Sequence, residues 1–279
     1  MSFIILGSDG FVASSFKNYL KIKKEKYKSI SKKEINFLYQ NSPLKFKKIL
    51  KNKKNINLVI ISAIAPAKTI DDYFKNITML LNIIKEIKKK SINKIIYLSS
   101  DAVYSDTKKK INEYNDTNPT TIHGMMHLHR ENILKLSFEK KLLIIRPTLL
   151  FGKNDTHNGY GPNKFMRAAM KNEQITLFGK GEEKRDHLYI GDLVKLIYLA
   201  AKKKNFIGIL NAASSEVISF YELSLKIKKL CNLNKKIKFK KRNGPMHHLG
   251  LRQFDNLKIK KNFKNFNFSK IENVLKEYL

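Results

Sequence analysis

Short apolar runs alternate with longer amphipathic stretches along this chain. The runs lie at 3–6, 57–63 and 95–98, a further strand is expected near 27–30, and apolar residues recur at helical spacing over 69–89. Buried strands of a parallel sheet are nearly continuous apolar runs, and the helices that connect them keep one face in solvent. The pattern therefore predicts an α/β fold, a parallel sheet with covering helices.

A glycine turn follows the first of these runs directly. It contains Gly7, Asp9, Gly10 and Phe11, with Ala13 in a third position that requires a small residue. Glycine lets the backbone approach a pyrophosphate closely, and the amides at the start of a helix face its negative charge. Strand, turn and helix together predict a phosphate cradle for a dinucleotide cofactor, formed by the first four of these residues.

Ser31, Lys32 and Lys33 follow the second expected strand, near 27–30. A site specific for NAD usually has an acidic residue here, which binds the ribose hydroxyls. A hydroxyl and two ammonium groups suit a 2′-phosphate instead, so Ser31 and Lys32 favour NADP. The general richness of the chain in lysine is the other explanation, and NAD stays open as the cofactor.

The main group of chemically active side chains follows the run at 95–98. Ser100 and Asp101 emerge where that strand is expected to end, at the edge where open α/β sheets bind ligands. A predicted helix after a proline then carries His123 and His127. Residues four apart share a helix face, so both imidazoles are expected to point the same way.

This segment resembles the active-site segment of the extended short-chain dehydrogenase/reductase family, the nucleotide-sugar epimerases, dehydratases and reductases. The family pattern is S-S-x-x-V-Y-G, then P-x-x-x-Y-G-x-x-K and a Glu four residues later. The matching positions of this chain are Ser99, Ser100, Val103, Tyr104, Pro119, Gly124 and Glu131. His123 stands where the family has its catalytic Tyr, and His127 stands where it has its Lys.

The resemblance implies a Rossmann-type doubly wound parallel sheet with a smaller C-terminal substrate lobe. We expect an NAD(P)-binding domain over residues 1–150 and a mainly substrate-binding lobe over 151–279. The run at 142–150 is expected to be one strand, and a strand near 207–213 is expected to return to the sheet. Ser62 and Ala63 fall where the family has a turn that faces the cofactor.

Two further matches concern substrate binding. Residues 175–193 resemble the family's strand, G-x-G-x-x-x-R-D turn and helix start, within which Asp192 is expected to be a helix N-cap. The resemblance implies that Arg185, on that turn, and Arg252 hold the substrate diphosphate, and that Tyr104 contacts substrate. Only six arginines occur in this lysine-rich chain, and only arginine offers a planar fork for phosphate.

Histidine is chemically suited to the expected role, because imidazole titrates near neutral pH whereas a phenol does so only when its pKa is lowered. We expect His123 to be the acid/base group, Ser100 to bond the reacting oxygen, and His127 to contact the nicotinamide ribose. Two alternatives stay open: a degenerate dyad that leaves a non-catalytic cofactor- and sugar-binding protein, and metal ligation. Gly124 stands where zinc proteases carry Glu, so no metal is predicted.

The carboxylates narrow the expected reaction. Similar 4,6-dehydratases place Asp-Glu after the strand hydroxyl, whereas this chain has Asp101 followed by Ala102. Dehydration is therefore disfavoured. Epimerisation or 4-keto reduction of a nucleotide-diphosphate sugar is predicted, with hydride transfer at a sugar carbon.

Composition excludes several other classes of protein. The formal net charge is +33, but the lysines are spread over every segment, so no specific nucleic-acid binding is expected. Cys231 is the only cysteine, no apolar run is long enough to span a bilayer, and no signal peptide is recognisable. We expect a cytoplasmic protein that does not bind membranes. The oligomeric state is left open, a homodimer included.

Overall fold

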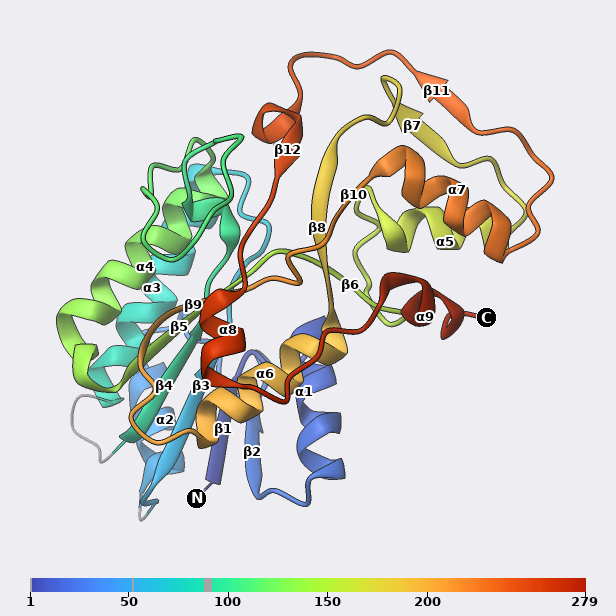
Figure 1. The fold of residues 1–279 in the computed structure, drawn as a ribbon. Coiled ribbons are helices and arrows are strands. Elements are labelled where there is room, and N and C mark those ends of the chain that lie inside the picture. Colours follow the sequence, from blue (N-terminus) through green and yellow to red (C-terminus); the bar gives the residue numbers. More distant parts are fainter. Residues whose placement is uncertain (1, 52, 88–91) are drawn as a thin grey trace. The chain divides into compact units, whose positions relative to one another are not determined.

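The computed structural model describes residues 2–51, 53–87 and 92–279. The chain forms two compact units (Figure 1). The first unit comprises Met1–Ser105, Tyr114–Pro147 and Val194–Leu210. The second comprises Asp106–Glu113, Thr148–Leu193 and Asn211–Leu279.

In the described part of the chain, a six-stranded sheet of order β2-β1-β3-β4-β5-β9 forms the centre of the first unit. Its strands are β1 (Ser2–Leu6), β2 (Tyr27–Ile30), β3 (Ile56–Ile60), β4 (Ile92–Leu98), β5 (Leu142–Pro147) and β9 (Gly208–Ala212). The registered neighbours from β2 to β5 are all parallel. The strand order reverses between β1 and β3, which makes their carboxyl edge the expected ligand-binding point of such a sheet.

Helices cover both faces of this sheet (Figure 1). They are α1 (Phe11–Ile22), α2 (Ser42–Leu50), α3 (Ile70–Ile87), α4 (Ile122–Phe138) and α6 (Ile190–Lys202). The short helices η1 (Asp101–Val103) and η2 (Glu139–Lys141) follow β4 and α4 in the chain. Ile4 and Leu6 pack with apolar residues of α2, α3 and α4 in one core cluster. On the other face Phe3 packs against Phe16 of α1 and Tyr198 of α6, with ring centroids 5.7 and 6.4 Å away. The predicted α/β fold class is confirmed.

The sequence prediction was wrong about the segment 142–150. It forms two strands in different sheets, β5 and β6 (Leu149–Phe151), rather than one. Thr148 lies between them, and its backbone N–H donates to the carbonyl oxygen of Ala212 at 3.1 Å. The expected end of the helix over 69–89 lies outside the described residues.

The second unit contains short strands and helices around its own apolar core. Its strands are β6, β7 (Thr176–Phe178), β8 (Lys184–Tyr189), β10 (Val217–Ser219), β11 (Lys238–Lys240) and β12 (Leu251–Arg252). Its helices are α5 (Pro162–Met170), α7 (Phe220–Leu230), η3 (His247–Gly250), α8 (Leu257–Asn262) and α9 (Ile271–Lys276). Strand β8 pairs with β6, β10 and β12.

Two local expectations in this unit were wrong. Arg185 lies on strand β8 rather than on a turn, because the segment pairs with β10 on one side and β12 on the other. Asp192 is not an N-cap: α6 begins at Ile190, and the Asp192 carboxylate accepts hydrogen bonds from the backbone N and the Oγ of Ser269 at 2.8 and 3.0 Å. No helix among the described residues is long and apolar enough to cross a membrane.

Candidate active site

The glycine turn joins β1 to α1 at the point where the strand order reverses. Gly7 has a φ of +89°, and a Cβ placed on it would lie 2.6 Å from the backbone N and Cα of Ser62. A side chain at this position would therefore push β1 and β3 apart. A Cβ on Gly10 would meet no atom within 4 Å, so the space in front of the start of α1 is open.

A cavity of about 230 Å³ lies at this carboxyl edge. Seven of the residues predicted to bind the cofactor line it: Gly7, Asp9, Gly10, Ser31, Lys32, Ser62 and Ala63. Phe11 and His127, the other two predicted cofactor residues, are not part of the lining. The cavity also has apolar walls that the sequence analysis did not identify, from Ile35, Phe37, Leu38 and Met79.

The turn after β3 is fixed by a buried asparagine of α3. The Asn76 Oδ1 accepts from the backbone N of Ile64 at 2.9 Å, and its Nδ2 donates to the Ile64 carbonyl oxygen at 3.1 Å. Both hydrogen-bonding groups of Ile64 are thus satisfied by one side chain. The turn that carries Ser62 and Ala63 is therefore held to the helix rather than free.

The start of α4 packs very closely on η1. A Cβ on Gly124 would lie 2.2 Å from the carbonyl oxygen of Ala102, so only glycine allows this approach. Thr121 caps the helix, its side chain accepting from the backbone N of Gly124 at 3.1 Å. Ser100 caps η1 in the same way, accepting from the backbone N of Ala102 at 3.2 Å. The packing therefore brings the first turn of α4 to the residues that follow β4.

His123 and His127 face each other, which confirms the expectation that both imidazoles point the same way. Their ring centroids are 4.6 Å apart and the rings are nearly perpendicular. His123 is half-buried, and its Nδ1 accepts a long hydrogen bond of 3.4 Å from the backbone N of Ala67. In the neutral ring the proton would thus lie on Nε2.

Burial keeps both rings uncharged at neutral pH. It lowers the pKa of His123, an effect that the nearby Asp101 carboxylate opposes. The pKa of His127 is lowered well below its usual range, first by burial and then by the repulsion that a protonated His123 and the Arg130 charge exert on a second proton. Both imidazoles of the pair are therefore neutral at neutral pH.

A buried polar network lies beneath the pair. Ser99 donates from Oγ to the Glu131 carboxylate at 2.6 Å, and Arg146 binds both oxygens of the same carboxylate at 2.9 and 2.5 Å. This network joins β4, α4 and β5. The Arg146 guanidinium also lies 4.7 Å above the ring of Tyr104, which is only 3% exposed. Tyr104, predicted to contact substrate, is thus largely covered by the protein.

The second unit contains Arg185 and Arg252, the residues predicted to bind the diphosphate. The Nη2 of Arg185 donates to Glu183 at 2.7 Å and to the carbonyl oxygen of His247 at 2.8 Å. Arg242, to which the sequence analysis assigned no role, binds the same Glu183 carboxylate. Arg252 is 2% exposed and lies 3.5 Å from Asp106. These guanidinium groups are already partnered by carboxylates of the protein.

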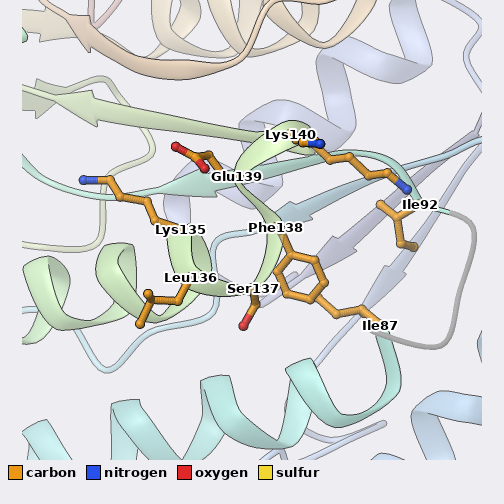
Figure 2. A pocket seen from close by; sticks show the side chains of 9 residues that line it. Ile87, Ile92, Lys135, Leu136, Ser137, Phe138, Glu139 and Lys140 are labelled. Atoms are coloured by element: carbon orange, nitrogen blue, oxygen red, sulfur yellow. The ribbon is translucent and has the colours of Figure 1, made fainter.

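A larger hollow, of about 840 Å³, lies at the end of α4 and η2 (Figure 2). Ile87, Ile92, Phe138 and lysines line it, and none of the predicted site residues does. Residues 88–91, which join two of the lining residues, lie outside the described part of the chain. This hollow therefore carries no argument about function.

Comparison with known proteins identifies the family. A model of the NAD dependent epimerase/dehydratase family matches residues 3–213. The chain belongs to this family. The match covers the six-stranded sheet apart from Ser2 and includes both histidines of the site, and it ends at the residue after β9.

Among curated relatives, the dTDP-D-glucose 4,6-dehydratase of Dictyostelium discoideum is 25% identical over 80% of this chain and 61% of that protein. The N-acetyl-alpha-D-glucosaminyl-diphospho-ditrans,octacis-undecaprenol 4-epimerase of Escherichia coli O157:H7 is 26% identical over 66% of this chain and 55% of that protein. These matches span less than two thirds of either relative's own length.

Solved structures show the same fold over the whole chain. The UDP-glucose 4-epimerase of Thermotoga maritima, solved with UDP-glucose, has a TM-score of 0.84 at 19% identity, covering 100% of this chain and 98% of that one. The UDP-glucuronic acid 4-epimerase of Bacillus cereus has a TM-score of 0.82 at 18% identity, covering 100% and 98%. The Rossmann-type architecture predicted from the sequence is thereby confirmed.

Proposed function

We propose that this family member is an NAD(P)-dependent nucleotide-sugar epimerase or 4-keto reductase, with Ser100, His123 and His127 at its reacting centre. One observation carries the proposal. The cofactor cavity follows the carboxyl ends of β1 and β3, and the hydroxyl and imidazoles follow the carboxyl end of β4, which lies beside β3 in the same parallel sheet. A dinucleotide bound there would extend from the cavity towards the proton-transfer groups.

The residues present fit a nicotinamide cofactor. The open space before Gly10 suits a pyrophosphate, and a cavity of about 230 Å³ suits the adenosine half rather than the whole molecule. The bound nicotinamide would accept hydride from a sugar carbon and return it. The protein would supply the proton transfer, through His123, and the hydrogen bond to the reacting oxygen, through Ser100.

NAD is supported by the family and by the Bacillus cereus neighbour, which was solved with NAD. We retain NADP preference as the finer proposal, because Ser31 and Lys32 line the cavity at the end of β2. Ser31 accepts from the backbone N of Glu34 at 3.1 Å, so its hydroxyl hydrogen is still available to a 2′-phosphate beside the Lys32 ammonium. Parallel calorimetric titrations with NAD and NADP test this, and clearly tighter NAD binding would overturn it.

The substrate is proposed to be a nucleotide-diphosphate sugar, held by Arg185 and Arg252 and contacted by Tyr104. We place cofactor binding in residues 1–150 and most substrate contacts in 151–279. A homodimer remains part of the proposal, to be tested by its mass in solution.

The deciding experiment incubates purified protein with a panel of nucleotide sugars and either cofactor. An epimerase would produce a new sugar isomer without net change in cofactor absorbance, and a 4-keto reductase would oxidise reduced cofactor only when a keto sugar is supplied. His123→Ala is the matched control. Binding of cofactor and sugar without turnover above that control would make the chain a non-catalytic binding protein.

A further inference from the structure

A tyrosine of the sheet forms a hydrogen-bonded pair with one of the two site histidines. The Oη of Tyr97, on β4, lies 2.6 Å from the Nδ1 of His127, on α4. Tyr97 is 1% exposed and His127 is 4% exposed, so the contact is shielded from water. The family's Tyr and Lys correspond to positions 123 and 127, so the phenol of Tyr97 has no counterpart among the roles considered above.

The direction of this hydrogen bond follows from which groups have partners. Tyr97 has one hydrogen-bond partner among the described residues, the Nδ1 of His127. If Nδ1 carried the proton and donated it, the phenol hydrogen would be buried without an acceptor, which costs about 1–3 kcal/mol. If the phenol donates, both groups are satisfied and the ring proton must lie on Nε2.

Arg130 packs against Tyr97 and supports this arrangement. Its guanidinium carbon lies 5.1 Å from the centre of the Tyr97 ring, and its Nη2 donates to the carbonyl oxygen of Ser62 at 2.8 Å. The positive charge disfavours a second charge on His127. Burial raises the pKa of Tyr97 by more than the Arg130 charge lowers it, so the phenol keeps its proton. One buried arginine thus links the ring pair to the turn that lines the cofactor cavity.

We propose that Tyr97 is a positioning residue that locks His127 in its Nε2–H form. In this form His127 offers a single, oriented donor to the cofactor ribose, where the resembling family offers an ammonium group. This deepens the proposed function and rests on it for the identity of the acceptor. The lock itself is a property of the chain alone, because every group that produces it belongs to the protein.

The lock can be tested without any turnover. Nitrogen NMR of protein labelled in its histidines distinguishes the two neutral forms and the charged form of each ring. We expect the His127 resonances, assigned from their absence in His127→Gln, to report the Nε2–H form from pH 8 down to pH 6. A proton on Nδ1, or a charged ring in that range, would overturn the proposal.

Turnover provides the second test. Tyr97→Phe should lower kcat about tenfold or more while the KM for nucleotide sugar changes less than twofold, because a ring free to change tautomer presents the wrong nitrogen. In a protein that already carries His127→Gln, Tyr97→Phe should not lower kcat any further. An equal loss in both backgrounds would show that Tyr97 acts through packing alone, and would overturn the proposal.

The chain offers a matched control in a second tyrosine–histidine pair, formed by Tyr73 of α3 and His129 of α4. Tyr73 contacts the Nδ1 of His129 through its Oη, and this pair is exposed. Tyr73→Phe therefore removes the same kind of contact outside the site and should leave kcat unchanged. If the wild-type protein shows no turnover at all, the proposed reaction fails, whereas the NMR experiment still decides whether Tyr97 locks His127.

Discussion

The two units treat their buried histidines differently. His127, in the first unit, has a phenol for its Nδ1 and a second imidazole beside it. His187, on β8 of the second unit, is 6% exposed, and neither of its ring nitrogens has a hydrogen-bond partner among the described residues. Both rings are kept neutral by burial, but only one is oriented.

Arg130 of the first unit and Arg185 of the second show the reverse contrast, whereas Arg146 of the first unit also binds a carboxylate, that of Glu131. Arg130, in the first unit, donates to the Ser62 carbonyl oxygen and to the Asn76 Oδ1, and to no carboxylate among the described residues. Arg185, in the second unit, is paired with Glu183, which also binds Arg242. A fixed tautomer and a held turn prepare a site before ligand arrives, whereas a neutralised guanidinium must exchange partners to bind one. The first unit is organised in advance, and the second would reorganise.

The largest effect is expected from a change to His123, in the first unit. His123→Ala should lower turnover by roughly 10²–10⁴ with cofactor affinity nearly intact, because the substrate would lose its proton-transfer group. Since burial lowers the pKa of His123, the rate in wild type should stay high at neutral pH and fall only on acidification below the usual histidine range. Rate measurements from pH 8 to pH 5 check this. His129→Ala, an exposed change on the same helix, is the control, and equal rates for both variants would contradict the role.

The next effect separates two glycines of the same turn. Gly10→Val should reduce NAD(P) affinity more than a hundredfold without unfolding the protein, since its side chain would enter open space that the pyrophosphate needs. Gly7→Ala should instead lower the melting temperature, because its Cβ would overlap the backbone of Ser62. Calorimetry and thermal unfolding measure the two quantities. Unchanged nucleotide affinity in Gly10→Val would show that this turn does not bind the pyrophosphate.

Two changes in the second unit, one at Arg185 and one at Glu183, should affect binding of a nucleotide sugar in opposite directions. Arg185→Lys should weaken nucleotide-sugar binding by about ten- to a hundredfold, the loss of one charge-assisted hydrogen bond worth ~1.5–3 kcal/mol. Glu183→Gln should tighten binding, because it removes the carboxylate with which a diphosphate must compete. Equal binding by Arg185→Lys, or weaker binding by Glu183→Gln, would show that these arginines serve the fold alone.

The sequence was sufficient where local pattern determines structure. Apolar runs predicted the strands of the sheet, and the spacing of Gly7 and Gly10 predicted a turn that lines a cavity with five other expected residues. The sequence was insufficient where a contact joins distant segments. Tyr97 and His127 are 30 residues apart and meet only because β4 and α4 pack in one register. The spacing of residues along the chain does not predict such a pair. The one available signal was a polar aromatic residue, Tyr97, within an otherwise apolar strand.

The same reason explains the errors. The segment 142–150 is apolar throughout, so nothing in its pattern showed that Thr148 would bond to Ala212 and divide it. The R-D turn was expected from a family pattern, yet β8 continues through Arg185 because two other strands pair with it there. Strand ends depend on partners that a one-dimensional pattern does not contain.

The smallest expected effect concerns the unpartnered histidine. A cavity of about 430 Å³ adjoins His187, and the ring of Phe220 lies 5.8 Å away. His187→Phe should therefore fit, keep the aromatic contact and raise the free energy of unfolding by about 1–3 kcal/mol, since two buried polar atoms without partners disappear. Denaturant unfolding at pH 7 measures the gain. His157→Phe, an exposed change in the same unit, should produce none.

The pH dependence of that gain identifies its cause. Burial lowers the pKa of His187 from 6.5 to about 3, so between these values the unfolded chain takes up a proton that the folded chain refuses. This difference does not affect the free energy of unfolding above pH 6.5, and it lowers that free energy as the pH falls below 6.5. The gain from His187→Phe should grow by about 1.4 kcal/mol per pH unit from pH 6.5 towards pH 4. Asp186, whose pKa is raised to about 6, titrates in both proteins and cancels in their difference. A gain that does not change with pH would mean that His187 has a partner in solution after all, and the contrast between the two histidines would disappear.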